Sequence, residues 1–563
     1  MVNCALFNNI SDEEFQKIYK CFNIKNIFSA IAAAAMLTAC VGDLNTIPLN
    51  PTDVTSETAY GADEAGYIQG LSKLYFQFIS NNITDLKVED AGASEFIRGL
   101  WSTQEVSSDA AKNAWPDSWV NEMNTNTWRG DVLNAAVYAV YVRSLQGIAY
   151  VNEYLRQTAD DKLESRGVST ELAAKIQVYR AEARFIRAFF YWALVDSFGN
   201  VPFSTEDSQF GGGYNPPQTD RATIFNYVIG ELEYLASESS VMPAAQSNYP
   251  RADKGSCLGL LARMYLNAKV YTGTQMFDKA KSTCERIYAL GYRLAPTYTE
   301  LFRGDNGENP DARGEFLFAA AYDSQNAQSY GGSTCLTCGS LNGTDGPTLL
   351  TGTKDGWSGN RVPYEYCQKY FDVQNPDYTA GTYDVVDERG KFFWILGRKQ
   401  SIEDLKNFTD GWSCYKFSNI PHDKTADEFS AQAASILFSN VDFPLIRLGE
   451  IHLIYAEACM HVGGDASAQI KALADRAKVA APAVIDENFL IAERARELMW
   501  EGHRRTDLVR YGKYTSKDFP WPYKGGSVQG NVDLGNHMNI FPIPSTEMAS
   551  NLDLIQNPGY AGR

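Results

Sequence analysis

The chain has 563 residues and a formal net charge of −18 at pH 7, with 68 acidic against 50 basic residues. This length allows one large domain or about three to four ordinary ones. The acidic balance, and a sequence without any Lys/Arg-rich run, argue against nucleic acid and against polyanionic ligands as partners. Aromatic residues make up 13% of the chain, and Tyr and Trp beyond the needs of a core are typical of binding surfaces.

The first predicted element is an apolar run at 27–37, IFSAIAAAAML, preceded by Lys25. It is too short to span a bilayer, which needs about 20 residues, but it suits the apolar part of a secretion signal. Leu37-Thr38-Ala39-Cys40 then matches a bacterial lipobox, so we expect a signal peptide at 1–39 and lipidation at Cys40. The alternative is an ordinary signal peptide in which this cysteine is incidental. Residues 1–23 are long and acidic for the start of a signal, which leaves the true translation start open.

The segment 40–60 is rich in Pro, Thr and Asn, and we predict that it is a tether behind the lipidated cysteine. Helical patterns begin after it. The strongest covers 171–199, where Phe185, Phe189 and Trp192 recur at helical spacing before Gly199.

Two later segments, 251–292 and 445–479, resemble each other at low identity. Each has the pattern of a helix, a short turn and a second helix, with Ala and Leu at packing positions and a break at Gly. Residues 140–158 form a further pair with 171–199. Such pairs are of the tetratricopeptide type, and they stack so that each buries the apolar face of its neighbour. We therefore predict a mostly α fold, a tetratricopeptide-like helix-pair scaffold.

Two stretches between these patterns, 81–130 and 296–440, are rich in Gly, Asn, Asp, Thr and Trp. We predict that they are long irregular loop insertions that carry the binding face, because loops of this length are usually functional or contain unrecognised elements. Cys335 and Cys338 lie in a loop-like sequence, GGSTCLTCGS, within the second insertion. A zinc site needs four ligands, and no second pair of this kind follows, so no metal centre is predicted.

The segment 493–512, ERARELMWEGHRRTDLVRYG, holds the densest group of charges. Helical spacing predicts Glu497 and Glu501 on one face, with Arg494 and Arg504 in reach. Carboxylates among arginines stay ionised and make poor general acids, so this segment favours a structural ion-pair network over a catalytic site.

Other enzyme signals are weak. Glycoside hydrolysis needs two carboxylates at a defined separation, and the sequence neither favours nor excludes such a pair. The loop 304–315 has oxygen ligands at alternate positions but lacks the EF-hand order, which keeps calcium as a minor alternative. We therefore predict no catalytic activity, no cofactor and no metal.

Four tryptophans lie close together in polar sequence, at Trp101, Trp115, Trp119 and Trp128. Any single one is best interpreted as an anchor that fixes a loop to the core. Four together indicate that at least one offers a flat face to a sugar ring, whose C–H groups stack on aromatic side chains.

Five stretches in the same order resemble the SusD/RagB family of Bacteroidetes outer-membrane lipoproteins. They are the lipobox with DLNTIPLNPT, AEARFIRAFFYWALVDSFGNVPF, PLIRLGEIHLIYAEA, ERARELMWEGHRRTDLVRYGKY and FPIPSTEMASNLDLIQNPGY. The resemblance implies one SusD-like helical domain over 61–563, held at the cell surface by the lipid anchor in the outer membrane. It also implies a partner, a SusC-like TonB-dependent transporter. Members of the family capture a nutrient, often a glycan and sometimes a peptide, and pass it to that transporter.

Starch-capturing members of the family resemble this chain near QEVSSD, NAQSYGGST and DGWSGNRVPYEYCQKYF. The resemblance implies that Trp115, Tyr330 and Trp357 form an aromatic arc that follows a curved α-glucan, with Arg98 beside it. Further glycan contacts from Asp117, Trp119 and Asn121 are weaker expectations, because the sequence after Trp115 does not align cleanly. The function implied is capture of an oligosaccharide, with α-glucan as the best match. The rival interpretations are a binder of peptide or another nutrient with the same fold, and a surface glycan hydrolase.

The lipobox generates a first prediction. Replacing Cys40 by alanine removes the thiol that would carry the acyl chains, so the Cys40→Ala variant should leave the outer-membrane fraction when no transporter partner is present. Cell fractionation and labelling with a radioactive fatty acid measure this. A variant that still fractionates with the membrane under these conditions would show that the anchor lies elsewhere.

Overall fold

The structure, a computed structural model, describes residues 56–81, 90–341 and 350–561. Cys40, the predicted signal peptide at 1–39 and most of the predicted tether lie outside these ranges. A compact unit begins at Ala62, and the described residues ahead of it hold the short helix α3 (Ser56–Ala59). Within the described ranges, every helix is too short or too polar to cross a membrane.

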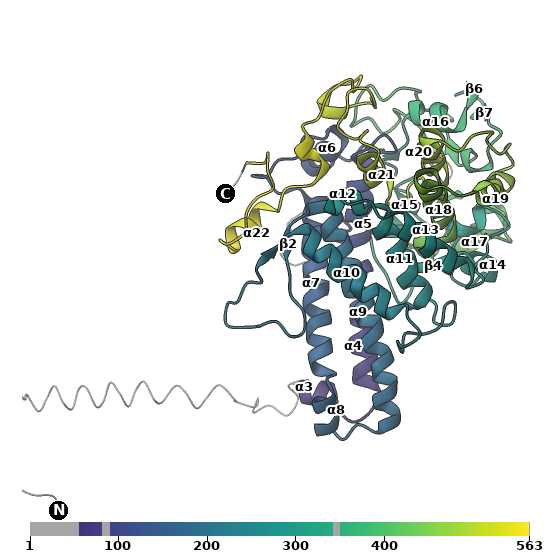
Figure 1. Cartoon of the computed structure of the whole chain (residues 1–563). Coiled ribbons are helices and arrows are strands. Elements are labelled where there is room, and N and C mark those ends of the chain that lie inside the picture. Colours follow the sequence, from purple (N-terminus) through teal and green to yellow (C-terminus); the bar gives the residue numbers. More distant parts are fainter. Residues whose placement is uncertain (1–55, 82–89, 342–349, 562–563) are drawn as a thin grey trace, which may run out of the picture. The chain divides into compact units, whose positions relative to one another are not determined.

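Helices form the frame of the unit that begins at Ala62, and successive long helices pack against one another (Figure 1). The frame consists of α4 (Ala65–Ile79), α7 (Ala135–Gln157), α9 (Thr170–Phe198), α10 (Arg221–Leu235), α11 (Lys254–Leu266), α13 (Phe277–Tyr288), α18 (Leu448–Val462), α19 (Ser467–Ala477) and α20 (Glu487–Glu497). The shorter helices α8 (Asp160–Ser165) and α12 (Ala268–Thr272) lie between frame helices, and α21 (Arg504–Arg510) and α22 (Ser545–Ser550) follow α20. The predicted pairs are observed as α7 with α9, α11 with α13 and α18 with α19, so the prediction of a mostly α, tetratricopeptide-like scaffold is confirmed.

The long helix α9 is the centre of the core. Ser169 begins it by accepting a hydrogen bond from the backbone N–H of Leu172, and Gly199 ends it at a φ of 74°. From Ile176 onwards the helix is buried on most sides, which explains why its sequence reads as apolar almost all round. Gly147 of α7 permits close contact with it, because a Cβ atom there would lie 2.4 Å from the ring of Phe190.

Ten short strands pair two by two in the described residues, and two of these pairs organise the insertions. The antiparallel pairs are β1 (Lys112–Asn113) with β5 (Asn360–Arg361), β2 (Val201–Pro202) with β3 (Gln218–Thr219), β4 (Phe316–Ala320) with β10 (Phe443–Arg447), β6 (Gln374–Asp377) with β7 (Thr382–Asp384), and β8 (Phe393–Trp394) with β9 (Ser413–Cys414). The pair β4–β10 brings the two ends of the second insertion together. The pair β1–β5 joins the first insertion to the second.

The insertions 81–130 and 296–440 are less irregular than predicted. They contain α5 (Phe96–Trp101), the π-helical turn η1 (Ser102–Val106), α6 (Ser118–Thr125), α14 (Pro310–Arg313), α15 (Gly332–Cys338), α16 (Tyr364–Phe371) and α17 (Ala426–Ala433). The expectation of a loop around Cys335 and Cys338 is wrong, because both cysteines lie in α15. These helices have eight residues or fewer, which is shorter than the window over which helical periodicity becomes visible.

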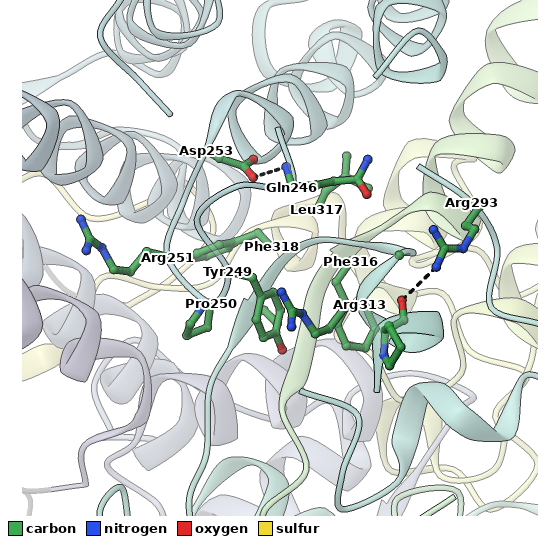
Figure 2. Close-up of a pocket in the computed structure, with 13 residues that line it drawn as sticks. Gln246, Tyr249, Pro250, Arg251, Asp253, Arg293, Arg313, Phe316, Leu317 and Phe318 are labelled. Atoms are coloured by element: carbon green, nitrogen blue, oxygen red, sulfur yellow. Dashed lines mark hydrogen bonds between the residues drawn. The ribbon is translucent and has the colours of Figure 1, made fainter. Parts of the chain in front are cut away.

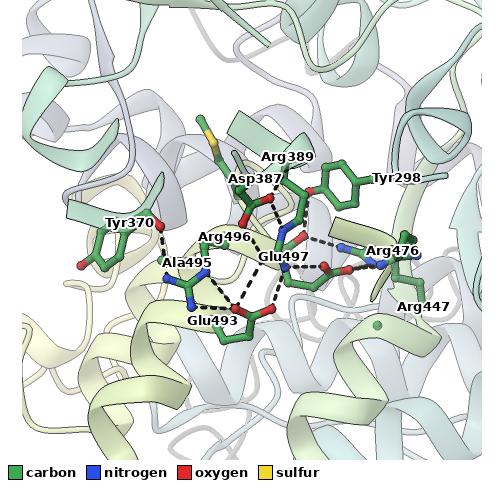
Figure 3. A network of polar contacts seen from close by, with 12 residues as sticks. Tyr298, Tyr370, Asp387, Arg389, Arg447, Arg476, Glu493, Ala495, Arg496 and Glu497 are labelled. Atoms are coloured by element: carbon green, nitrogen blue, oxygen red, sulfur yellow. Dashed lines mark hydrogen bonds and ion pairs between the residues drawn. The ribbon is translucent and has the colours of Figure 1, made fainter. Parts of the chain in front are cut away.

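A buried network of ion pairs joins the far end of the frame to the second insertion (Figure 3). Glu497, the last residue of α20, pairs with Arg389, Arg447 and Arg476. Burial alone would raise the pKa of the Glu497 carboxyl, but the guanidinium groups of Arg476, Arg447 and Arg389 hold it well below its usual range. Glu497 is therefore ionised and structural, and the predicted ion-pair network is confirmed.

The predicted partners within this network are wrong. Helix α20 ends at Glu497, so Glu501 lies beyond it and not on the same helical face. Arg494 pairs with Asp507 at 2.8 Å, and Arg504 pairs with Asp109 at 2.7 Å. Helical spacing identifies neighbours along one helix, whereas Asp507 lies on the next helix, α21, and Asp109 lies in the first insertion.

Glu501 is the site of a stability prediction. It is 2% exposed, and its carboxylate accepts from Arg447 Nε at 2.6 Å and from Lys416 Nζ at 2.7 Å. The Glu501→Ala variant leaves both cations without this partner inside the protein, so it should lower the free energy of unfolding by about 3–5 kcal/mol. Urea unfolding followed by circular dichroism measures this change.

Glu285 provides the matched control, because it pairs with Lys281 at the surface with its own side chain 48% exposed. The Glu285→Ala variant should lose less than about 1 kcal/mol. Equal losses in the two variants would contradict the structural role of the buried network.

Candidate functional site

The candidate site lies where the two insertions meet. The β1–β5 pair is extended by a hydrogen bond of 2.9 Å from the backbone N–H of Ala114 to the carbonyl of Gly359. The indole of Trp115 packs directly on that glycine, since a Cβ atom at Gly359 would lie 2.5 Å from Trp115 Nε1. Gly359 also has a φ of 105°, a conformation that favours glycine. Trp115 therefore lies beside the segment that carries Trp357.

Tyr330 lies against the same segment. Its ring centroid is 6.2 Å from that of Trp357, with an angle of 38° between the ring planes, and 4.9 Å from that of Phe438. The backbone N–H of Trp357 donates to the carbonyl of Cys338 at the end of α15, the helix that follows Tyr330. We refer to Trp115, Tyr330 and Trp357 as the aromatic trio.

All three rings of the trio retain contact with solvent. Tyr330 is 40% exposed, and Trp115 and Trp357 are partly exposed. In contrast, Trp101, Trp119 and Trp128 are 1%, 5% and 3% exposed. Three of the four clustered tryptophans are therefore core anchors, and Trp115 is the one whose ring reaches the surface.

Arg98 supports the trio from beneath. It is 2% exposed, and its guanidinium carbon lies 4.6 Å from the ring centroid of Trp115 and 5.6 Å from that of Trp119. The same guanidinium reaches Asp90 at 3.2 Å and Cys335 Sγ at 2.6 Å. Arg98 thus connects Trp115 to α15, and its contact with a ligand stays a prediction.

The three weaker candidates lie just beyond Trp115. Asp117 precedes α6 and is partly exposed, and Asn121 on that helix is exposed. Trp119 faces the core beside Arg98. Asp117 and Asn121 reach the surface, whereas Trp119 could contact a ligand only if the surrounding structure moved. The glycan-binding role of all three stays a prediction.

The cysteine pair below the trio has the character of core residues. Cys335 and Cys338 are buried and form no disulfide. Burial raises the pKa of their thiols, to about 11 and about 12 respectively, so both stay protonated and unreactive near neutral pH. In the described ranges, the acidic loop at 304–315 contributes Asp305 to one group of potential metal ligands, with His422 and Asp423. These three side chains are partly or fully exposed, and His422 Nδ1 lies 2.6 Å from Asp305 Oδ2.

A separate cavity of about 190 Å³ lies between the segment around Tyr249 and β4 (Figure 2). Its charged side chains are already engaged. Arg313 lies over the ring of Tyr249, with its guanidinium carbon 4.9 Å from the centroid, and Arg293 donates to the carbonyl of Pro310. Asp253 caps α11 by accepting from the backbone N–H of Ser256. This cavity is lined by structural contacts and is distinct from the aromatic trio.

Comparison with known proteins identifies the family. Residues 381–560 match the SusD family, and residues 76–266 match a family described as starch-binding and associating with the outer membrane. The starch-binding protein SusD of Bacteroides thetaiotaomicron is 30% identical to this chain, over 95% of this chain and 99% of that protein. The chain belongs to the SusD family. A SusD-like protein of Bacteroides ovatus is 24% identical over 62% of this chain and 61% of that protein.

Solved structures share the fold. A SusD-like carbohydrate-binding protein from Bacteroides fragilis superimposes with a TM-score of 0.67 at 20% identity, covering 88% of this chain and 99% of that one. Surface glycan-binding protein A from Bacteroides thetaiotaomicron, solved with laminarihexaose, has a TM-score of 0.65 at 18% identity, covering 87% and 98%. At these identities the likeness concerns the SusD fold. The Bacteroides thetaiotaomicron relative and one matched family are described as starch-binding, so the chain is grouped with binding proteins and not with enzymes.

Two residues of the site were not predicted from the sequence. Glu95 accepts a hydrogen bond from Ser329, the residue before Tyr330, and Phe438 packs on the ring of Tyr330. The capping position of Glu95 before FIRGLW is a signal that could have been noticed, since its side chain accepts from the backbone N–H of Arg98. Nothing in the sequence around Phe438 distinguishes it from other phenylalanines.

Proposed function

We propose that this SusD-family protein captures α-glucan oligosaccharides at the cell surface and delivers them to a SusC-like TonB-dependent transporter. The observation that carries the proposal is the convergence of three solvent-accessible aromatic rings from two separate insertions. Aromatic faces bind sugars by stacking on C–H groups, and stacking does not require the ligand to be charged. The excess of acidic over basic residues agrees with a neutral ligand.

The tilt between the rings supports a curved ligand. Tyr330 and Trp357 differ by 38° in the orientation of their ring planes, so neighbouring sugar rings stacked on them would turn relative to each other. An α-linked glucan chain curves in this way, whereas a flat β-linked chain such as a cello-oligosaccharide does not. The starch-binding name of the relative with 30% identity points to the same class of ligand.

Binding should be weak. Stacking on one aromatic ring is worth about 1–3 kcal/mol in nucleic-acid complexes, which we use as an upper guide. Association also costs several kcal/mol in lost freedom of the two molecules. The balance corresponds to dissociation constants of roughly millimolar to micromolar. Weak binding suits a protein that must release its ligand again.

The proposal includes an anchor and a partner. Lipidation at Cys40 and a tether over 40–60 would hold the single SusD-like domain at 61–563 to the outer membrane, with its face exposed at the cell surface. The family described as associating with the outer membrane supports this arrangement. Delivery to the transporter would then require no free diffusion of the captured oligosaccharide.

Calorimetric titration with maltoheptaose, cellohexaose and laminarihexaose tests the ligand. We expect heat of binding with maltoheptaose and little with cellohexaose, because the tilted rings follow a curved chain. Laminarihexaose is included because a fold neighbour was solved with it. Preference for laminarihexaose or cellohexaose would overturn the α-glucan assignment. Silence with all three sugars would favour another nutrient, and new reducing ends would favour a hydrolase.

Replacing Trp115 tests the site. The Trp115→Ala variant should lose most of the affinity for maltoheptaose while its melting temperature changes little, because the ring is partly exposed. The Arg98→Ala variant should weaken binding less but lower the melting temperature more, since Arg98 is 2% exposed.

Tyr234 on α10 is the matched control, because it is an exposed aromatic residue, at 47%, in a helix outside the trio. The Tyr234→Ala variant should bind maltoheptaose like the parent protein. Unfolding of Trp115→Ala, or equal losses of affinity in Trp115→Ala and Tyr234→Ala, would show that the trio is not the binding face.

A further inference from the structure

A buried carboxyl group lies directly beneath the loop that carries Tyr330. Glu95 is 0% exposed, and its Oε1 accepts hydrogen bonds from Tyr322 Oη at 2.9 Å and from Ser329 Oγ at 2.8 Å. Its Oε2 accepts from the backbone N–H of Arg98 at 3.2 Å, which caps the first turn of α5. One side chain therefore ties α5 to the residue immediately before Tyr330.

The loop is fitted closely onto this carboxyl group. A Cβ atom at Gly331 would lie 2.3 Å from Glu95 Oε2, and one at Gly332 would lie 1.8 Å from Tyr322 Oη. On the other side, a Cβ atom at Gly92 would lie 2.5 Å from the carbonyl oxygen of Tyr330. The backbone on both sides of the tyrosine ring thus has little room to move while Glu95 keeps its position.

The same helical turn also supports Trp115. Glu95 is the N-cap residue of α5, and Arg98 follows it by three residues in the first turn of the helix. Arg98 lies beneath the ring of Trp115, and Glu95 holds the loop of Tyr330. The relative placement of the two rings depends on this turn.

We propose that Glu95 is a positioning residue that holds Tyr330 in the binding face and makes the order of that face depend on its protonation. The inference rests on the proposed function, because it concerns the same aromatic trio. Glu95 does not touch a ligand, since it is fully enclosed. It acts through Ser329 and through the packing of Gly331.

The protonation state of Glu95 changes the stability of the loop, because burial is the largest influence on the pKa of its carboxyl group. Burial raises the pKa of Glu95 to about 8, although the hydrogen bonds from Ser329, Tyr322 and Arg98 act in the opposite direction. An opening of the loop would hydrate the carboxyl group and return its pKa toward 4.5, the ordinary value. The protonated carboxyl group therefore stabilises the closed loop over the open one. This stabilisation is fully present below pH 4.5 and is lost as the pH rises through about 8.

The other titratable groups around Glu95 do not change their charge near pH 8. Burial raises the pKa of Cys335 on α15 to about 11 and lowers that of Arg143 on α7 to about 10. The pKa of Tyr322, which follows β4, lies well above its ordinary value because of burial and of Glu95 itself. Arg98 remains charged and is paired with Asp90. Glu95 is thus the group at this point whose charge changes near pH 8.

Hydrogen exchange of the full chain, read by mass spectrometry, tests the inference without a ligand. In the parent protein, protection of the peptide that contains Ser329–Gly332 should fall as the pH rises from about 6 to about 9, after correction for the intrinsic pH dependence of exchange. The Glu95→Gln variant keeps the shape of the side chain but cannot ionise, so its protection should stay constant across this range. Parent-like pH dependence in Glu95→Gln would overturn the inference.

Glu105 provides the matched control. It is also 0% exposed, and burial raises its pKa to about 7, but its Oε1 accepts from the backbone N–H groups of Gly502 and His503. The Glu105→Gln variant should therefore keep the pH dependence of the Tyr330 peptide. Loss of that dependence in Glu105→Gln as well would show that the effect is global and would contradict a specific role for Glu95.

Affinity gives the second measurement. Both Glu95→Ala and Ser329→Ala cut the connection to the loop, so they should weaken maltoheptaose binding, by about tenfold for Glu95→Ala. Glu95→Gln should restore binding to within about threefold of the parent at neutral pH. Ser329→Ala leaves Glu95 in place, so it remains informative if Glu95→Ala does not fold. Parent-like exchange and parent-like affinity in Ser329→Ala and Glu95→Ala would overturn the inference.

The two measurements separate this inference from the proposed function. If the parent protein binds none of the three oligosaccharides, the proposed function fails while the exchange experiment still decides the role of Glu95. If the parent binds maltoheptaose but the exchange pattern does not respond to Glu95→Gln, the positioning role fails while the proposed function stands.

Discussion

The pairing of Arg447 with Glu497 is the contact on which the arrangement of the insertions depends. Arg447 ends β10, and its guanidinium also reaches Glu315, next to the start of β4, at 2.8 Å. The two ends of the long second insertion are thereby fixed to each other and to α20. Ionised side chains in a buried site are costly unless fully paired, and here each charge meets several opposite charges. The network thus imposes one arrangement on a segment whose own helices and strands are short.

Once the second insertion is fixed in this way, short backbone contacts are enough to bring the aromatic trio together. The β1–β5 pair has two residues in each strand, yet it brings Trp115 beside the segment of Trp357. Arg98 and Glu95, from one turn of α5, support Trp115 and the Tyr330 loop from below. The exposed rings are therefore held by buried charged and polar groups. Rings that are already ordered lose less freedom when a ligand stacks on them.

Features that depend on contacts between residues close in the sequence could be predicted, and features that depend on contacts between distant residues could not. Helix pairs such as α7 with α9 were predictable because their apolar positions repeat every three to four residues along one segment. The short helix α15 was not, since seven residues rich in Gly, Ser, Thr and Cys form too brief a pattern. The trio could be named by resemblance to a family, but the proximity of Trp115 to Gly359 depends on chain segments more than two hundred residues apart. The partners of Glu497 were missed because they lie in other segments of the chain. Glu95 was missed because the helix that it caps has six residues, which is too short to show helical periodicity.

The division between buried supports and exposed rings bears on how such a face could change its ligand. The residues of the trio are partly exposed, so under the proposed function their substitution would alter contacts with a sugar at a small cost in stability. Substitution of Arg98 or Glu95 leaves buried polar partners unsatisfied and disturbs more than one ring at once. If the trio binds the ligand as proposed, ligand preference can vary through Trp115, Tyr330 and Trp357, while Arg98 and Glu95 hold the spacing and tilt of the rings. Because the tilt between the rings is fixed, exchange of one aromatic ring would change the affinity for a glycan more readily than it would change which glycan curvature fits.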